Sequence, residues 1–113
     1  MENKQQQENE ETYQRFTELV NMAPKEIEEW LKTDESKRVG QDSGDGESIG
    51  HKSGQRIIEI KHKKKADLNE QDYGHMRKVI SYISRHTAQE PAHDKETSNW
   101  RYSLKNWGHD PMK

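Results

Sequence analysis

One run of apolar residues constrains the fold of this chain more than any other feature. Between Asn69 and Pro91, large apolar side chains recur every three or four positions, which is the spacing of one face of an α-helix. The face consists of Tyr73, Met76, Ile80, Ile83 and Thr87. Asn69 suits the N-cap position, and Pro91 cannot continue a helix, so the sequence predicts a helix between these two residues.

Three shorter segments also predict helices. The stretch "TYQRFTELVNM" carries helically spaced apolar residues, and "NMAPKEIEEWLKTDES" places Pro24 in a first turn, where its missing N–H costs nothing. The segment "SIGHKSGQRIIEIKH" is ambiguous, because Ile58, Ile60 and His62 alternate as in a strand. Its length and the lack of a second strand favour a helix, in which Gly50 and Gly54 would permit close packing.

Apolar residues are scarce, and their distribution predicts the domain organisation. Only 27% of the chain is hydrophobic and 35% is charged. Residues 1–12 hold a single apolar residue and predict a disordered polar tail. Residues 13–113 predict a single helical domain, with a flexible, glycine-rich loop at 38–47. The expected fold is therefore all-α: a small bundle of four main helices with an irregular C-terminal tail packed across it.

The C-terminal tail "SNWRYSLKNWGHDPMK" concentrates aromatic residues in a polar chain. Residues 99–107 predict at most one short helical turn. The aromatic side chains could bind a partner, or they could pack against the helices as part of the core. Because the domain needs every large apolar group, we expect Trp100, Leu104 and Trp107 to face inward. Arg101 and Lys105 would then face solvent, with His109, and extend a basic surface.

Composition and motifs exclude several classes of function. The chain has no cysteine, so it has no disulfide framework and no thiolate metal site. His75 and His86 would lie about 16 Å apart on a helix, too far to share a metal. No nucleotide-binding or hydrolase motif is present. From the lack of these motifs we expect a protein that is not an enzyme and needs no cofactor. We expect it to be cytoplasmic, since no secretion signal or membrane span is evident.

Charge is distributed unevenly along the chain. Residues 1–50 carry 6 Lys and Arg against 13 Asp and Glu, a net charge of −7, whereas residues 51–113 carry 13 against 8, a net charge of +5. Cations that cluster in the second half can neutralise nucleic-acid phosphates. The candidate phosphate-binding residues are Arg56, Lys61, Lys63, Lys64, Lys65, Arg77, Lys78 and Arg85. The structural alternative is that Lys61 to Lys65 complement the dipole of a helix end.

The short connection "KADL" between two predicted helices is typical of a helix-turn-helix motif. The second helix of such a motif reads bases with its first residues. Here those residues include Glu70 and Asp72, whose carboxylates would meet phosphates. The sequence therefore favours phosphate contacts over base readout.

Four stretches resemble a family of small, uncharacterised microbial proteins, a domain of unknown function whose members are often labelled "DNA-binding protein". They are "NMAPKEIEEWLKTDESKRVGQ", "GESIGHKSGQRIIEIKHKKKADL", "DYGHMRKVISYISRH" and "NWRYSLKNWGHDP". Ala23 departs from the pattern, which has Thr or Ser before Pro24. The resemblance implies a small helical domain that binds DNA. We expect a non-enzymatic DNA-binding protein; the alternative is a protein–protein interaction module that uses the acidic first half or the aromatic tail.

Overall fold

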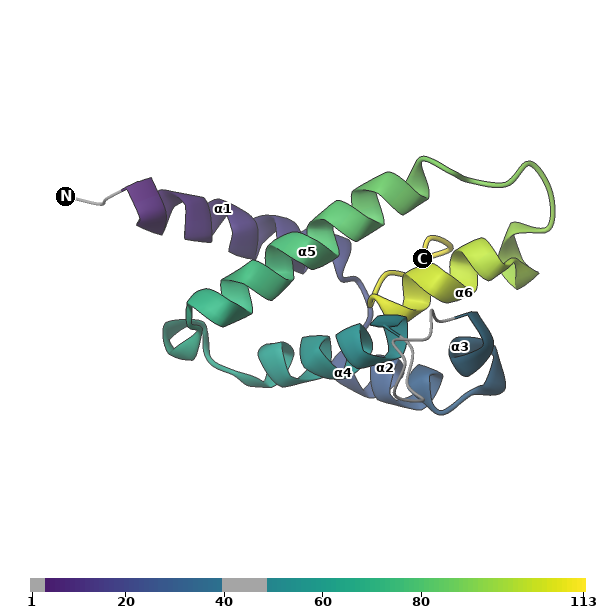
Figure 1. Ribbon diagram of the computed structural model, residues 1–113, viewed down its shortest axis with the longest axis horizontal. Helices are drawn as coiled ribbons and strands as arrows, with labels where there is room; N and C mark the ends of the chain where they lie inside the picture. The colour runs from purple at the N-terminus through teal and green to yellow at the C-terminus, as the bar shows by residue number, and fades with distance from the viewer. Residues whose placement is uncertain (1–3, 40–48) are drawn as a thin grey trace.

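The computed structural model describes residues 4–39 and 49–113, and the regular elements in these stretches are all helical. This part of the chain forms six α-helices and two short 3-10 helices, and Figure 1 shows how they are arranged. They are α1 Lys4–Leu19, α2 Pro24–Leu31, α3 Asp34–Val39, α4 Ile49–His62, η1 Lys65–Asp67, α5 Glu70–Thr87, η2 Lys95–Thr97 and α6 Asn99–Asn106. The described part of the chain is therefore all-α, with more helices than the four expected.

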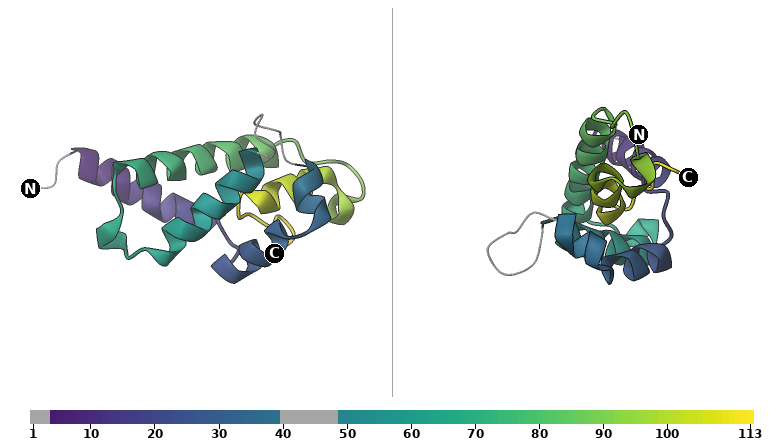
Figure 2. Two further views of the ribbon diagram at one scale, coloured as in Figure 1. Left: turned by 60° about the horizontal axis from the view of Figure 1, so that its bottom comes forward. Right: turned by 90° about the vertical axis from the view of Figure 1, so that its right-hand side faces the viewer.

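The helices form two layers that meet at α6. α1 packs along α5 in one layer, and α2 packs along α4 in the other (Figure 2). α6 lies between the layers and contacts α2, α3, α4 and α5. At the opposite end, α4 leads through η1 into α5 (Figure 1). This arrangement leaves one side of α5 exposed to solvent.

Local sequence signals explain where the main helices begin. The Asn69 side chain accepts a hydrogen bond from the Asp72 backbone N–H at 2.9 Å, which confirms the predicted N-cap of α5. Ala23 has no side chain that could cap α2. Its own N–H instead donates to the Glu26 carboxylate at 2.9 Å, and Pro24 occupies the first turn.

The core forms where the apolar faces of the helices meet. Its central residues come from α2, α4, α5 and α6: Ile27, Ile57, Met76, Val79, Ile83 and Leu104. Gly54 allows α4 to approach α6, since a Cβ there would lie 2.7 Å from the Asn106 backbone oxygen. This confirms the close packing expected at Gly54.

The C-terminal segment is part of the core. Leu104 is fully buried and Trp107 is 4% exposed, which confirms that both face inward. Trp107 stacks on Tyr82 of α5 at 4.2 Å between ring centroids. Trp100 is partly buried and packs against the core. The Trp30 indole donates to the buried Asn106 amide oxygen at 2.7 Å, joining α2 to α6.

The structure differs from the expectations in three places. Residues 4–12, expected as part of a disordered tail, are helical and continue into the rest of α1. α3 was not predicted, because it has no apolar stripe and its only buried residue is Ser36. α6 spans Asn99–Asn106 rather than a single turn. Most of the loop expected at 38–47 lies outside the described residues, and its first two residues end α3.

None of the described helices is long and apolar enough to cross a membrane.

Candidate nucleic-acid interface

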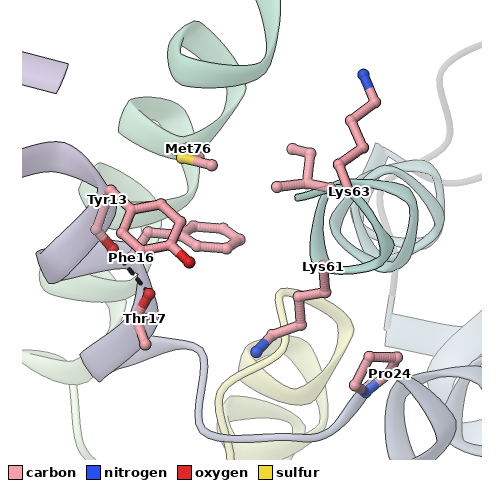
Figure 3. Close-up of a pocket in the computed structure, with 8 residues that line it drawn as sticks. Tyr13, Phe16, Thr17, Pro24, Lys61, Lys63 and Met76 are labelled. Carbon is pink, nitrogen blue, oxygen red and sulfur yellow. Dashed lines mark hydrogen bonds between the residues drawn. The ribbon is translucent and has the colours of Figure 1, made fainter. Parts of the chain in front are cut away.

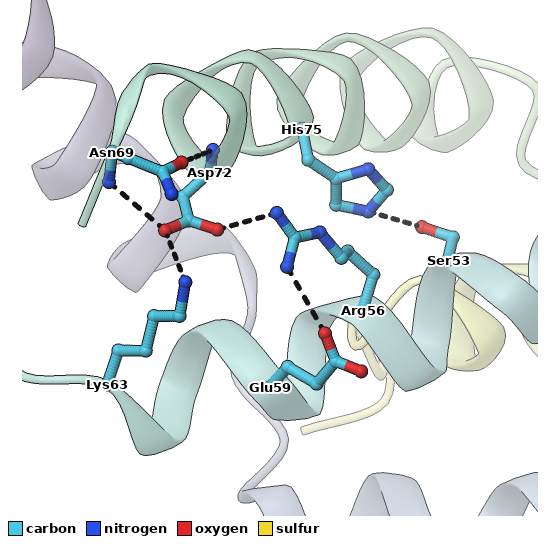
Figure 4. Close-up of polar contacts among 7 residues, drawn as sticks. All are labelled: Ser53, Arg56, Glu59, Lys63, Asn69, Asp72 and His75. Atoms are coloured by element: carbon cyan, nitrogen blue, oxygen red, sulfur yellow. Dashed lines mark hydrogen bonds and ion pairs between the residues drawn. The ribbon is translucent and has the colours of Figure 1, made fainter. Parts of the chain in front are cut away.

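A buried carboxylate organises the junction between α4 and α5. Asp72 lies in the first turn of α5 with its side chain fully buried. Arg56 reaches it at 2.6 Å and Lys63 at 2.8 Å, both from α4 (Figure 4). The Asn69 backbone N–H donates to the same carboxylate at 3.1 Å. Burial alone would raise the pKa of Asp72, but the hydrogen bonds from Lys63 and Asn69 and the two positive charges hold it below its usual value.

This junction changes the roles of two predicted phosphate-binding residues. Arg56 and Lys63 neutralise Asp72, and Arg56 also pairs with Glu59 at 3.2 Å. Both residues therefore form intramolecular ion pairs, although their side chains are partly exposed. From the sequence, the Asp72 carboxylate was expected to repel phosphates. Because this carboxylate is buried and paired, it does not face solvent where phosphates would bind.

Two more of the predicted cations face α1. Lys65 forms an ion pair with Glu10 and lies 4.9 Å from the centre of the Tyr13 ring. The hydrogen bond to Glu10 raises the pKa of Lys65. Arg77 donates to the neutral Asn9 side chain at 2.7 Å, so its charge remains uncompensated by that contact. Residues 4–12, taken from sequence as a tail, thus hold Lys65 and Arg77 in place.

Lys61 lies apart from the other predicted residues. Its side chain points into the space between α1 and Pro24, whereas Lys63 points away from that space (Figure 3). Burial lowers the pKa of Lys61, and the nearby positive charge of Lys113 lowers it further. The structure therefore does not bring Lys61 onto a common surface with Lys78 and Arg85.

The exposed face of α5 carries the remaining cations. Arg77, Lys78 and Arg85 are all exposed. Between them lie small exposed residues, Gly74, Ser81 and Ser84. Asp72 is the one acid in the sequence from Gln71 to Gln89, and it is buried. We call this exposed face of α5, from residues 71 to 87, the α5 cationic face; the exposed Glu70 precedes it at the start of the helix.

Lys78 and Arg85 are seven residues apart, which is about two helical turns or 10 Å along the axis. No carboxylate within the described ranges 4–39 and 49–113 forms an ion pair with either residue. The Arg85 Nε–H donates only to the Ser81 backbone oxygen, at 3.3 Å. Lys64 is exposed on the connection that leads into α5. Four predicted residues, Arg77, Lys78, Arg85 and Lys64, therefore remain open to solvent.

The C-terminal cations do not extend this surface as expected. Arg101 forms a two-point ion pair with Asp110, both contacts at 3.1 Å, which raises the pKa of Arg101. Lys105 lies 4.1 Å from the centre of the Trp30 ring. The His109 Nδ1–H donates to the Leu19 carbonyl at 2.6 Å. His109 and Lys105 thus contact α1 and α2, and the Arg101–Asp110 pair lies within the C-terminal segment.

A serine–histidine contact also joins α4 to α5. Ser53 Oγ and His75 Nε2 lie 3.1 Å apart (Figure 4). Burial lowers the pKa of His75, and the charges of Arg56 and Lys78 lower it further. Ser53 is only 3% exposed, whereas His75 is partly exposed, so the contact is part-buried. Within the described residues, no three His, Cys, Asp or Glu side chains are grouped so as to hold a metal ion.

Comparison with known proteins shows the family of the chain. Residues 15–105 match the family model described as "Protein of unknown function (DUF3140)". The chain belongs to this family. The matched region runs from α1 into α6 and includes the whole α5 cationic face. Searches of curated proteins and of solved structures found no significant match. The description of this family assigns no activity to its members.

Proposed function

We propose that this protein is a non-enzymatic DNA-binding protein that contacts the phosphate backbone through the α5 cationic face. The observation that carries the proposal is the charge of that face. It presents Arg77, Lys78 and Arg85 to solvent, and its one carboxylate, Asp72, is buried and neutralised. Exposed cations without nearby acids attract phosphates and release their counterions.

The shape of the α5 cationic face also suits a phosphate backbone. Gly74, Ser81 and Ser84 are small, so they let the helix approach a strand closely. The serine hydroxyls can donate hydrogen bonds to phosphate oxygens. Lys64 lies on the connection into α5 and adds a fourth cation. These contacts position a protein on DNA without reading its sequence. Binding to DNA would also agree with the expected cytoplasmic location.

Base readout by the start of α5 has little support. Glu70 is exposed there and would repel phosphates at the edge of a groove. Arg56 and Lys63, which could have compensated it, are held by Asp72. We therefore propose binding with weak sequence preference and strong dependence on salt.

Fluorescence anisotropy with a labelled DNA duplex tests this proposal. The double variant Lys78→Ala/Arg85→Ala removes two exposed cations from α5 and should weaken binding about tenfold or more. The matched control Lys25→Ala/Lys37→Ala removes the same charge from exposed positions on α2 and α3. Equal weakening by both pairs would show that only net charge matters, and no weakening by the first pair would refute the proposed face.

A protein partner that binds α1 is the second candidate. The N-terminal end of α1 extends beyond α5 in Figure 1. Glu8 and Glu11 of this helix are exposed. An acidic helix of this kind suits a basic partner surface. The aromatic tail supports this reading less, because Leu104 and Trp107 are buried. Recovery of a stoichiometric protein partner that survives nuclease treatment and is lost in Glu8→Lys/Glu11→Lys would favour this candidate.

A further inference from the structure

A small cavity lies between α1, the start of α2 and the C-terminal end of α4. It is partly enclosed and has a volume of about 190 Å³. Its lining combines apolar, hydroxyl-bearing and cationic side chains, and it includes no acid: Tyr13, Phe16, Thr17, Pro24, Ile60, Lys61, Lys63 and Met76. This cavity is separate from the α5 cationic face.

Lys61 gives the cavity an uncompensated positive charge. Its ammonium points into the cavity, while the Lys63 ammonium points away and is held by Asp72 (Figure 3). In the part of the chain that the structure covers, no carboxylate lies within ion-pair distance of Lys61. Lys113, whose positive charge acts on Lys61, is itself paired with Glu26 at 2.8 Å. A half-buried ammonium without a counter-ion is unfavourable unless an anion accompanies it.

The inner wall of the cavity is apolar. Phe16 and Ile60 are each 3% exposed, and Met76 is fully buried. The Tyr13 hydroxyl points toward the same space and can donate a hydrogen bond (Figure 3). An engineered protein cavity of about 150 Å³ is large enough to hold benzene. A volume of about 190 Å³ therefore accommodates one ring or a short alkyl chain with a polar head group.

We propose that this cavity binds a small amphipathic carboxylate, such as an aromatic or short-chain aliphatic acid. Its carboxylate pairs with the Lys61 ammonium and accepts a hydrogen bond from the Tyr13 hydroxyl. Its apolar body packs against the accessible edges of Phe16 and Ile60, in front of the fully buried Met76. The bound anion supplies the counter-ion that Lys61 lacks, and the apolar wall favours an acid with a hydrophobic body over a bare anion.

The lowered pKa of Lys61 supports this arrangement. Burial is the main cause, and the charge of Lys113 adds to it. A carboxylate at this position would reverse the shift, because an opposite charge favours the protonated amine. Binding should therefore weaken as the pH rises through the pKa of Lys61.

Titration of the full chain with benzoate, followed by amide NMR shifts, tests the proposal. Benzyl alcohol has the same ring without the charge, and acetate has the charge without the ring. We expect benzoate to bind with a Kd of about 1 mM, a weak affinity that is typical of so small a ligand. Its binding should change the chemical shifts of the amides around Phe16 and Lys61. Benzyl alcohol and acetate should each bind at least about tenfold more weakly.

Lys61→Met is the decisive variant, and Lys64→Met is its control. Methionine keeps the apolar length of the side chain and removes a half-buried charge, so the variant should fold as well as the wild type. It should lose benzoate affinity at least about tenfold and keep its weak affinity for benzyl alcohol. Lys64→Met, at an exposed lysine outside the cavity, should bind benzoate as the wild type does. Equal binding of benzoate to both variants, shifts confined to other regions, or no benzoate binding at all would overturn the proposal.

Discussion

Replacement of Trp107 by alanine should destabilise the domain more than any other single change in the C-terminal segment. Trp107 is 4% exposed, stacks on Tyr82 at 4.2 Å and lies parallel to His75 at 6.4 Å. It also provides the C-cap of α6. Removing a buried tryptophan costs about 3–5 kcal/mol, and loss of the stacked pair adds about 1 kcal/mol.

The free energy of unfolding should therefore fall by about 4 kcal/mol or more. A domain of this size is stable by about 5–15 kcal/mol, so this loss removes a large part of the total. Tm should fall by roughly 15–25 °C. Urea titration followed by circular dichroism measures the change without relying on tryptophan fluorescence.

Trp100→Ala is the matched control for this experiment. Trp100 is only partly buried, and its indole donates to the His86 carbonyl at 2.7 Å. It should cost about 2 kcal/mol, roughly half the cost at Trp107. A Trp107→Ala variant that is folded within about 1 kcal/mol of the wild type, or that loses DNA binding while fully folded, would refute the structural role of Trp107 in the core.

Four further substitutions test the packing and the titrating groups. Gly54→Ala should destabilise the fold because its Cβ would meet the Asn106 carbonyl at 2.7 Å, whereas Gly74→Ala, with open space around it, should stabilise α5 by up to about 1 kcal/mol in urea titrations. Asp72→Asn should cost about 2 kcal/mol at neutral pH, since Arg56 and Lys63 are partly exposed. The pKa of Asp72 is lowered in the folded state. The stability difference between wild type and variant is therefore complete at a pH above the unfolded-state pKa of about 4, and it disappears as the pH falls through the lower folded-state pKa. The lowered pKa of His75 makes the wild type less stable as pH falls below about 6.5, and His75→Gln should reduce that dependence in denaturation at a series of pH values.

Periodicity predicted the long helices because each buries a continuous apolar face. The stripe from Tyr73 to Ile83 and the N-cap at Asn69 predicted α5 and its first residue, and the helix ends at Thr87, before the expected limit at Pro91. In α4, the length of the segment correctly favoured a helix although Ile58 and Ile60 also alternate as in a strand, and Ile57 and Ile60 are its buried apolar residues. The segments that sequence missed lack such a face. α3 buries only Ser36, and the first turns of α1 bury nothing before Thr12.

The candidate site was predictable only in its residue types. Which cations are compensated depends on pairs far apart in the chain. Lys65 and Glu10 are 55 positions apart, and Arg77 and Asn9 are 68 apart. Asp72 was read from the sequence as an acid that would oppose phosphates. Its position in the capping box after a basic run was the one signal that it could instead bind Arg56 and Lys63.

The salt dependence of DNA binding tests the central claim most directly. Three to four phosphate contacts through the α5 cationic face and Lys64 predict a slope of about −3 in a plot of log Kobs against log salt concentration. The variant Lys78→Ala/Arg85→Ala should reduce the slope to about −1, while Lys25→Ala/Lys37→Ala should leave it unchanged. A wild-type slope near zero, or the same slope in all three proteins, would contradict the account.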